Sequence, residues 1–407
     1  MFFFKHLIDI VSVYNSFLKP ILFKICGIFI LEGSMFMRKL KYLDKTLLFV
    51  TVLLFIFGLI MVFSASNVTA YMYHAVSPYN YFIKQGMFLI VGFVLFIFMI
   101  AFPSTAYGKL SWLLLIVCIT ALIALLIYGS AKNQAISWFQ VGPINIQPSE
   151  FVKVITIVFL AEYYEINKAR LKSWFTSLFP IGICVIVAGL IFMQPDLGTM
   201  LIYAMIVMVI FFSVPIAREI KMKILFIGMC IVTLGSVLIF GLGRNLLQER
   251  QMERFVVSNP CERILDDGNQ VCNCYIAMNN GGLTGVGLGN STQKYLYLPE
   301  PYTDFIFAII VEELGVITGV LLICAYIFVI FRILVIGRRA KNNRGAVACY
   351  GIAFYIFIHV AVNLLGIMGL IPLTGVPLPF MSYGGSYTIC LIAALTIVQK
   401  VCIESHS

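Results

Sequence analysis

The stretch YLPEPYTDFIFAIIVEELG, residues 297–315, places three carboxylates at the start of a long apolar run. Asp304 stands at the edge of the run, and Glu312 and Glu313 lie about 12 Å deeper if the run is a helix. An ionisable group in such a run must face water, a partner or a cavity, because lipid does not solvate charge. Asp304 is therefore a candidate general base, with a simple interaction with the helix dipole as the alternative.

The two glutamates are neighbours in the chain, so on a helix their side chains point about 100° apart and have different targets. At least one of them should be neutral or paired with another helix. A structural role is favoured for both, with Glu312 the better candidate for an accessory acid because it lies nearer the face of Asp304.

The segment SWFQVGPINIQPSEFVKV, residues 137–154, carries Glu150 and Lys153 at the start of another apolar run. Pro148 and Glu150 suit the first turn of a helix. Lys153 lies three residues after Glu150, so the two charges could neutralise each other. Equally, a cation at this depth could hold a lipid phosphate.

Two further turns carry polar groups. Asp196 in QPDLGT is placed as a helix N-cap, and it could also belong to a site. Ser382 and Ser386 lie in TGVPLPFMSYGGSYT, where small residues permit close helix packing and exposed hydroxyls could contact sugar or phosphate.

The elements that position these groups follow from composition. The 407 residues are 61% hydrophobic and 11% charged, and apolar runs of about 20 residues recur along the chain. The sequence therefore predicts an all-α polytopic membrane protein with about ten transmembrane helices. Their approximate spans are 46–66, 82–102, 110–129, 149–165, 176–194, 197–215, 223–242, 304–336, 346–371 and 380–400.

Lys and Arg in the short connections fix the orientation, because such residues are retained on the cytoplasmic side. They predict that both termini are cytoplasmic, and the formal charge of +10 then reflects topology and not nucleic-acid binding. The chain divides into an N-terminal leader, 1–42, and a membrane domain, 43–407, with a large extracellular loop at about 243–303.

That loop contains a glycine cluster at 281–289, which is either a flexible connector or a backbone cradle for an anion. It also contains Cys261, Cys272 and Cys274, among which one disulfide is chemically feasible. By this topology Lys153, Asp196 and Asp304 all fall on the outer side of the membrane, where we expect them to share one aqueous pocket.

Four ordered motifs resemble the SEDS family (shape, elongation, division and sporulation): QPSEFVK, QPDLGT, GGLTGVGLGNSTQKYLYLPEPYTDFIFAIIVEELG and GLIPLTGVPLPFMSYGGS. The resemblance covers about residues 43–400. It implies a ten-helix peptidoglycan glycosyltransferase that polymerises lipid II on the outer face of the bacterial cytoplasmic membrane. It also implies a class B penicillin-binding transpeptidase as partner, with other divisome membrane proteins, and location at the division septum.

By motif position, the resemblance implies that Asp304 is the essential acid and that Lys153, Asp196 and Glu150 line a substrate cavity. The reaction needs a base for the attacking sugar hydroxyl and cations for the departing pyrophosphate. Besides Lys153, the loop offers three cations that could stabilise the pyrophosphate, namely Arg250, Arg254 and Lys294.

A divalent cation, Mg²⁺ or Mn²⁺, could help to stabilise the pyrophosphate with Asp196 or Glu312 as ligands, although no spacing demands one and the identity of any metal stays open. Two details depart from the family: Ser137 precedes Trp138 where Arg is common, and Gly268-Asn269-Gln270 replaces GYQ.

Other functions compete with this interpretation. A flippase for the lipid-linked precursor would also have ten spans and buried charges, but it needs a polar path across the midplane, whereas the charges gather on one side. A silent scaffold is disfavoured by the intact Asp304 motif. Within the family, the segment GLIMVFSASN favours the septal over the elongation branch.

Overall fold

The structure is a computed structural model that describes residues 40–72, 76–128, 130–132, 135–142, 144–226, 260–263, 268–295 and 297–406. Nearly all of the predicted leader lies outside these residues. The same is true of most of the predicted span 223–242 and of Arg250 and Arg254.

Nine of the ten predicted spans correspond to helices in the described part of the chain. Seven of these are long and apolar enough to cross a membrane, whereas α8 is shorter and α6 carries several charges. The nine helices are α3 (Lys45–Met72), α4 (Asn80–Ala101), α5 (Ser104–Tyr128), α6 (Pro148–Ile166), α7 (Trp174–Phe192), α8 (Leu197–Ser213), α12 (Ile306–Arg338), α13 (Asn343–Ile367) and α14 (Gly385–His406).

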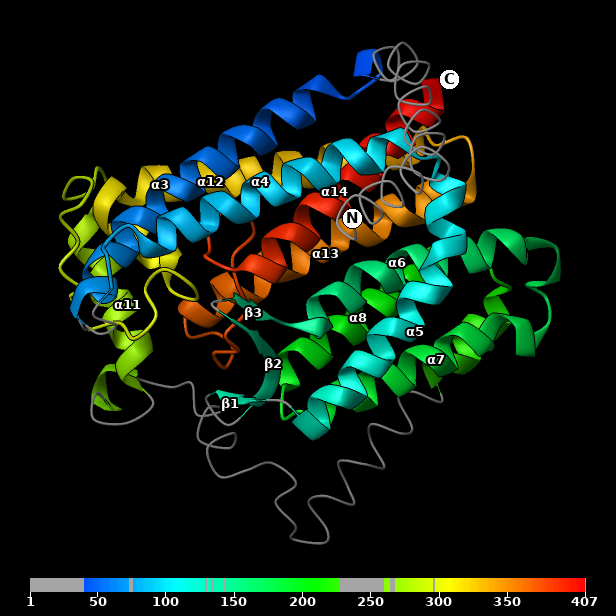
Figure 1. Ribbon diagram of the computed structural model, residues 1–407, viewed down its shortest axis with the longest axis horizontal. Coiled ribbons are helices and arrows are strands. Elements are labelled where there is room, and N and C mark those ends of the chain that lie inside the picture. Colours follow the sequence, from blue (N-terminus) through cyan, green and yellow to red (C-terminus); the bar gives the residue numbers. More distant parts are fainter. Residues whose placement is uncertain are drawn as a thin grey trace, which may run out of the picture.

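Helices α13 and α14 run through the middle of the bundle (Figure 1). α13 packs against α6, α8, α12 and α14, and α14 packs against α4 and α6 as well. The helices α3, α4 and α12 lie on one side of this pair, and α5 to α8 lie on the other (Figure 1). Side chains of α6, α13 and α14 therefore meet in the interior of the protein.

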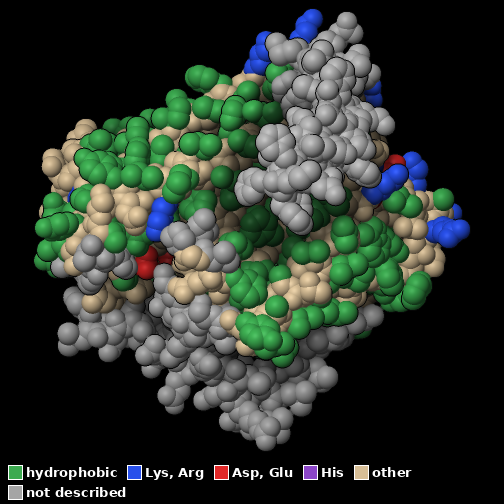
Figure 2. All heavy atoms as spheres, viewed as in Figure 1, with side chains coloured by type: hydrophobic (Ala, Val, Ile, Leu, Met, Phe, Trp, Pro, Cys, Tyr) green, Lys and Arg blue, Asp and Glu red, His purple; other side chains and the backbone are tan. Residues whose placement is uncertain are grey.

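The outer helices present apolar side chains outward, as expected in lipid. In α4 the buried residues Gln85, Phe88 and Gly92 form one stripe at helical spacing, and most other positions are apolar and exposed. Figure 2 shows hydrophobic side chains over much of the visible face, with Lys and Arg gathered mainly toward one end.

Both described ends of the chain meet at one end of the bundle. The backbone N–H of Asp44 donates to the side chain of Gln399, and the Gln399 amide donates back to the Asp44 carbonyl. The Tyr42 and His406 rings stack with their centroids 6.0 Å apart. The ten spans predicted from the sequence, an even number, would bring both ends of the chain to the same side of the membrane, and the cytoplasmic location of that side stays a prediction.

The eighth span is interrupted, which differs from the continuous helix that hydropathy predicts. Gly315 within α12 has φ +84°, a conformation that L side chains rarely adopt. The glycine cluster at 281–289 forms backbone hydrogen bonds with α12 on both sides of the break. Val286 N–H donates to the Glu312 carbonyl, and Val316 N–H donates to the Gly282 carbonyl. The cluster is therefore a backbone partner for the broken helix and not a flexible connector.

The large loop carries a helix, α11 (Gly268–Gly281), preceded by a short 3-10 helix (Pro260–Arg263). A disulfide joins Cys261 to Cys272, one of the pairings that the sequence left open, and Cys274 is a buried free thiol. α11 packs against α12, so this part of the loop is tied to the membrane helices.

A small antiparallel sheet was not anticipated by the all-α prediction. It contains β1 (Ser130–Lys132), β2 (Ala135–Val141) and β3 (Ile144–Ile146), in the order β1-β2-β3. Gly142, with φ +60°, lies in the turn that pairs Val141 with Ile144. Strand β3 ends two residues before α6 begins, so the sheet fixes the position of the first turns of α6, which carry Glu150 and Lys153.

Candidate functional site

Asp304 lies in the turn immediately before α12, and its side chain is partly exposed. Its backbone is fixed from two directions: Asn363 of α13 donates to the Asp304 carbonyl at 2.9 Å, and Ser382 donates to the Thr303 carbonyl at 2.5 Å. The carboxylate lies over Gly375, where a Cβ would approach Oδ2 to 3.4 Å. That distance is an ordinary van der Waals contact, so glycine is favoured at 375 by its backbone conformation, φ +67°, and not by a need for space beside the acid.

Asp196 caps α8, as predicted, and its carboxylate accepts from the Thr199 N–H at 3.0 Å. The first turn of α8 packs on the connection that also contacts Asp304: a Cβ on Gly198 would lie 2.9 Å from the Cβ of Thr374. Because Thr374 precedes Gly375, the start of α8 and the start of α12 lie against one connection between α13 and α14.

Lys153 is buried, with 1% of its side chain exposed. Its ammonium donates to Glu150 Oε1 at 2.8 Å and to His359 Nε2 at 2.9 Å. The mutual neutralisation of Glu150 and Lys153 is therefore present. The expectation of a shared open pocket is wrong at Lys153, because packing of α6 against α13 encloses the ammonium.

The hydrogen bonds of His359 define its tautomer. Nδ1 lies 2.7 Å from the Tyr355 carbonyl, which can only accept, so Nδ1 carries the proton. Nε2 then has a lone pair and accepts from Lys153, which makes His359 a neutral acceptor for a cation. Glu150 Oε2 has no hydrogen-bond partner among the described residues, so one acceptor in this cluster is open.

One helical turn of α13 connects the cation with the acid. His359 contacts Lys153, and Asn363, four residues later, contacts the backbone of Asp304. Residues at this spacing lie on the same face of a helix, about 6 Å apart along its axis. Both contacts join segments that are far apart in the chain, so sequence spacing could not reveal the pairing. The only signal of His359 and Asn363 in the sequence was their polarity inside an apolar span.

Glu312 and Glu313 have separate targets, as predicted from their adjacency. Glu312 accepts from the Ser291 hydroxyl and from the N–H and hydroxyl of Thr292. Glu313 accepts from Ser64 of α3 and from Lys294 at 2.9 Å. The carboxylates therefore anchor the segment after the glycine cluster, and neither is exposed.

This arrangement corrects the picture of Lys294 as a loop cation that faces the substrate. Its side chain is 1% exposed, and it donates to Glu313 and to the Gly289 carbonyl. The accessory role of Glu312 is likewise replaced in the structure by hydrogen bonds within the loop.

The expected exposure of the two serine hydroxyls is also wrong. Ser382 accepts from the Leu378 N–H while it donates to the Thr303 carbonyl, and it is 2% exposed. Ser386 accepts from the Gln147 N–H at the start of α6 and is 6% exposed. Both hydroxyls join chain segments around the candidate site, and a contact with substrate would require these bonds to be exchanged.

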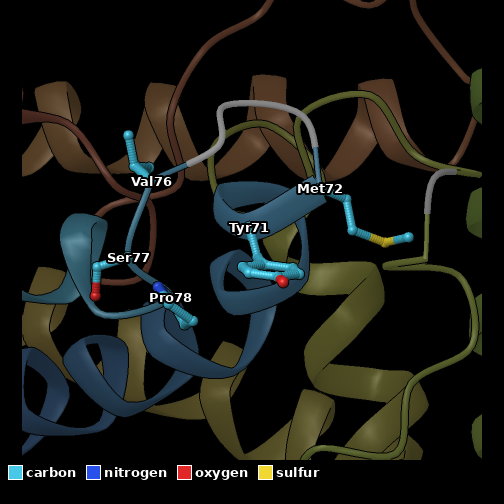
Figure 3. A pocket seen from close by; sticks show the side chains of 5 residues that line it. All are labelled: Tyr71, Met72, Val76, Ser77 and Pro78. Carbon is cyan, nitrogen blue, oxygen red and sulfur yellow. The ribbon is translucent and has the colours of Figure 1, made fainter.

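Metal ligation and one cavity in the described part of the chain bear on the extent of the site. No group of three His, Cys, Asp or Glu side chains in the described residues could hold a metal, so no step is derived through one. A cavity of about 670 Å³ at the α3–α4 connection is lined by Tyr71, Met72, Val76, Ser77 and Pro78 (Figure 3). None of the predicted site residues that the structure describes lines this cavity.

Comparisons with known proteins show which family the chain resembles. Residues 44–407 match the FtsW, RodA and SpoVE family of cell cycle proteins. A probable peptidoglycan glycosyltransferase FtsW of Bacillus subtilis is 38% identical, with 90% of this chain and 92% of that protein covered. The stage V sporulation protein E of the same organism is 35% identical, with 88% and 96% covered.

Solved structures share the fold. A chain from a peptidoglycan synthase complex that coordinates polymerization and crosslinking superposes with a TM-score of 0.72 at 23% identity, covering 90% of this chain and 99% of that one. The rod shape determining protein RodA of Thermus thermophilus gives a TM-score of 0.63 at 23% identity, covering 90% and 98%.

The fold and the site together define a multi-pass membrane protein in which one turn of the central helix α13 contacts both a buried cation, Lys153, and the backbone of a partly exposed acid, Asp304. The chain belongs to the FtsW, RodA and SpoVE family.

Proposed function

We propose that this protein is a peptidoglycan glycosyltransferase that polymerises lipid II on the outer face of the cytoplasmic membrane, with Asp304 as its general base. Family membership and the relatives named peptidoglycan glycosyltransferase support the reaction. The observation that carries the residue assignment is the setting of Asp304, whose side chain is partly exposed while Asn363 fixes its backbone.

In the proposed reaction, a sugar hydroxyl of one lipid-linked disaccharide attacks the anomeric carbon of another. Asp304 accepts the hydroxyl proton as the new carbon–oxygen bond forms. The bond from the anomeric carbon to the lipid pyrophosphate breaks, and the pyrophosphate leaves with the electron pair. Attack from the opposite side inverts the configuration, and both lipid tails can stay in the bilayer.

Lys153 would offset the negative charge of the departing pyrophosphate. In the structure its ammonium is held by Glu150 and His359, so a phosphate oxygen would take the place of Glu150. His359, a neutral acceptor, would keep the ammonium in position during this exchange. Arg250 and Arg254 stay candidates for stabilising the same charge and lie outside the described residues.

The proposal includes a setting in the cell. A class B penicillin-binding transpeptidase would cross-link the strands, together with other divisome membrane proteins, and both termini would be cytoplasmic. The identities of 31–38% to proteins named FtsW support a role at the division septum rather than in elongation.

The test is polymerisation of purified lipid II by the protein with its cognate transpeptidase. We expect Asp304→Asn to lower the rate at least about 100-fold, the low end for loss of a general base. Glu300→Gln, which removes an acid four residues earlier, should retain activity. Equal polymer from the parent and Asp304→Asn would reject the assignment of Asp304, and transbilayer movement of lipid II without polymer would favour a flippase.

A further inference from the structure

A cavity lined by basic residues lies at the end of α12 that is farther from Asp304. It has a volume of about 270 Å³ and forms where α3 begins and where α12 and α14 end. Among the described residues, four Lys and Arg side chains line it, Lys41, Lys45, Arg332 and Arg339, together with His406. None of them belongs to the site described above.

The charges of this cavity are unbalanced. Asp44 is the one carboxylate among the lining residues, and it already pairs with Arg332 at 2.8 Å. Asp44 is 8% exposed and also caps α3 by accepting from the Leu47 N–H. No carboxylate of the described residues forms an ion pair with the other three cations, which are all exposed, so the cavity offers three positive charges to an anionic ligand.

The walls of the cavity are apolar. Leu43, Val335 and Ile336 line it beside the basic groups. One turn further along α3 from Lys45, Phe49 is 68% exposed, and on α12 the neighbour of Arg332, Phe331, is 61% exposed. Exposed apolar side chains therefore lie within about one helical turn of the basic residues that line the cavity, an arrangement that suits a ligand with an anionic head and an acyl tail.

We propose that this cavity binds the phosphate of an anionic phospholipid from the membrane leaflet at this end of the bundle. Lys41, Lys45 and Arg339 contact the phosphate, and the acyl chains lie along the exposed apolar faces of α3 and α12. Basic pockets between transmembrane helices recognise lipid head groups in this way. The bound lipid joins three helix ends, and its binding does not depend on the proposed reaction.

The test measures lipid binding to the purified full-length protein by native mass spectrometry, with phosphatidylglycerol and phosphatidylcholine as probes. We expect phosphatidylglycerol to bind more tightly, and the double variant Lys45→Gln/Arg339→Gln to weaken that binding about 25-fold, at about fivefold for each of the two charges removed. The matched control, Arg338→Gln/Lys341→Gln, removes two cations of the same helix end that do not line the cavity. It should change binding by less than about twofold.

Thermal unfolding of each variant is measured in parallel to check that the parent fold is retained. The variant Arg339→Lys, which keeps the positive charge that Arg339→Gln removes, should bind phosphatidylglycerol as the parent does. Equal loss of binding in both double variants would reject the cavity, since it would show general attraction to a basic surface. Displacement of the lipid by inorganic phosphate at equal concentration would show a soluble-anion site and would also overturn the proposal.

Discussion

The buried ion pair between Lys294 and Glu313 offers a test of whether the loop lysine supports structure or contacts substrate. The two side chains are 1% and 0% exposed, and their charged atoms lie 2.9 Å apart. Lys294→Met would leave the Glu313 carboxylate buried with Ser64 as its remaining side-chain partner. Removing one member of a buried pair costs about 3–5 kcal/mol, because the other charge loses its partner without regaining water.

The measurement is thermal unfolding of the purified protein in detergent. Lys294→Met should unfold at a clearly lower temperature, and Lys294→Met/Glu313→Gln should recover most of the loss because it removes both charges. Lys168→Met is the control, since Lys168 also pairs with a glutamate at 3.0 Å but is 61% exposed. Its pair should contribute under about 1 kcal/mol. If Lys294→Met unfolds at the parent temperature and instead raises the substrate KM, the structural role of Lys294 is refuted.

Two further predictions address the cation and the loop cysteines. His359→Leu should lower the polymerisation rate about 10- to 100-fold, the effect of losing a hydrogen bond to a charged group, whereas His359→Gln, whose amide oxygen can accept from Lys153, should retain most of it; similar loss in both would contradict the role of His359 as an acceptor. Burial raises the pKa of the Cys274 thiol, so its thiolate fraction at pH 8 is small and grows only at higher pH. Maleimide should therefore label none of the three loop cysteines at pH 8 until the disulfide is reduced. After reduction, peptide mass spectrometry should find label on exposed Cys261 before buried Cys272. Rapid labelling of Cys274 would contradict its burial.

Much of the architecture could be predicted from the chain alone. Continuous apolar runs define spans because lipid forces every backbone group to be satisfied within a helix. The same local logic identified the N-cap at Asp196 and the divergence of Glu312 from Glu313, since both follow from the geometry of a single helix. Each of these features depends on residues within one or two turns of one another.

The features that sequence reasoning missed depend on distant segments. Hydropathy carries no information about the backbone angle φ, so it could not predict the break at Gly315. The break is stabilised by hydrogen bonds between the glycine cluster and the backbone groups of α12 that lose their helical partners. Lys294 was assigned to the substrate because it lies in a polar loop, and its partner Glu313 is identified only by the way the loop folds back. A polar loop residue is not necessarily exposed once the loop packs on a broken helix.

The broken α12 and the regular α13 together position Asp304, which is partly exposed, and Lys153, which is buried. The break at Gly315 lets the loop contribute Lys294, Ser291 and backbone N–H groups to the two glutamates. These contacts anchor the part of α12 before the break, which begins two residues after Asp304. Across from it, α13 stays regular from Asn343 to Ile367, and one turn of it bonds to Lys153 on one side and to the Asp304 backbone on the other. Movement of α13 by a fraction of a turn would therefore alter both contacts at once, which couples the position of the cation to that of the acid.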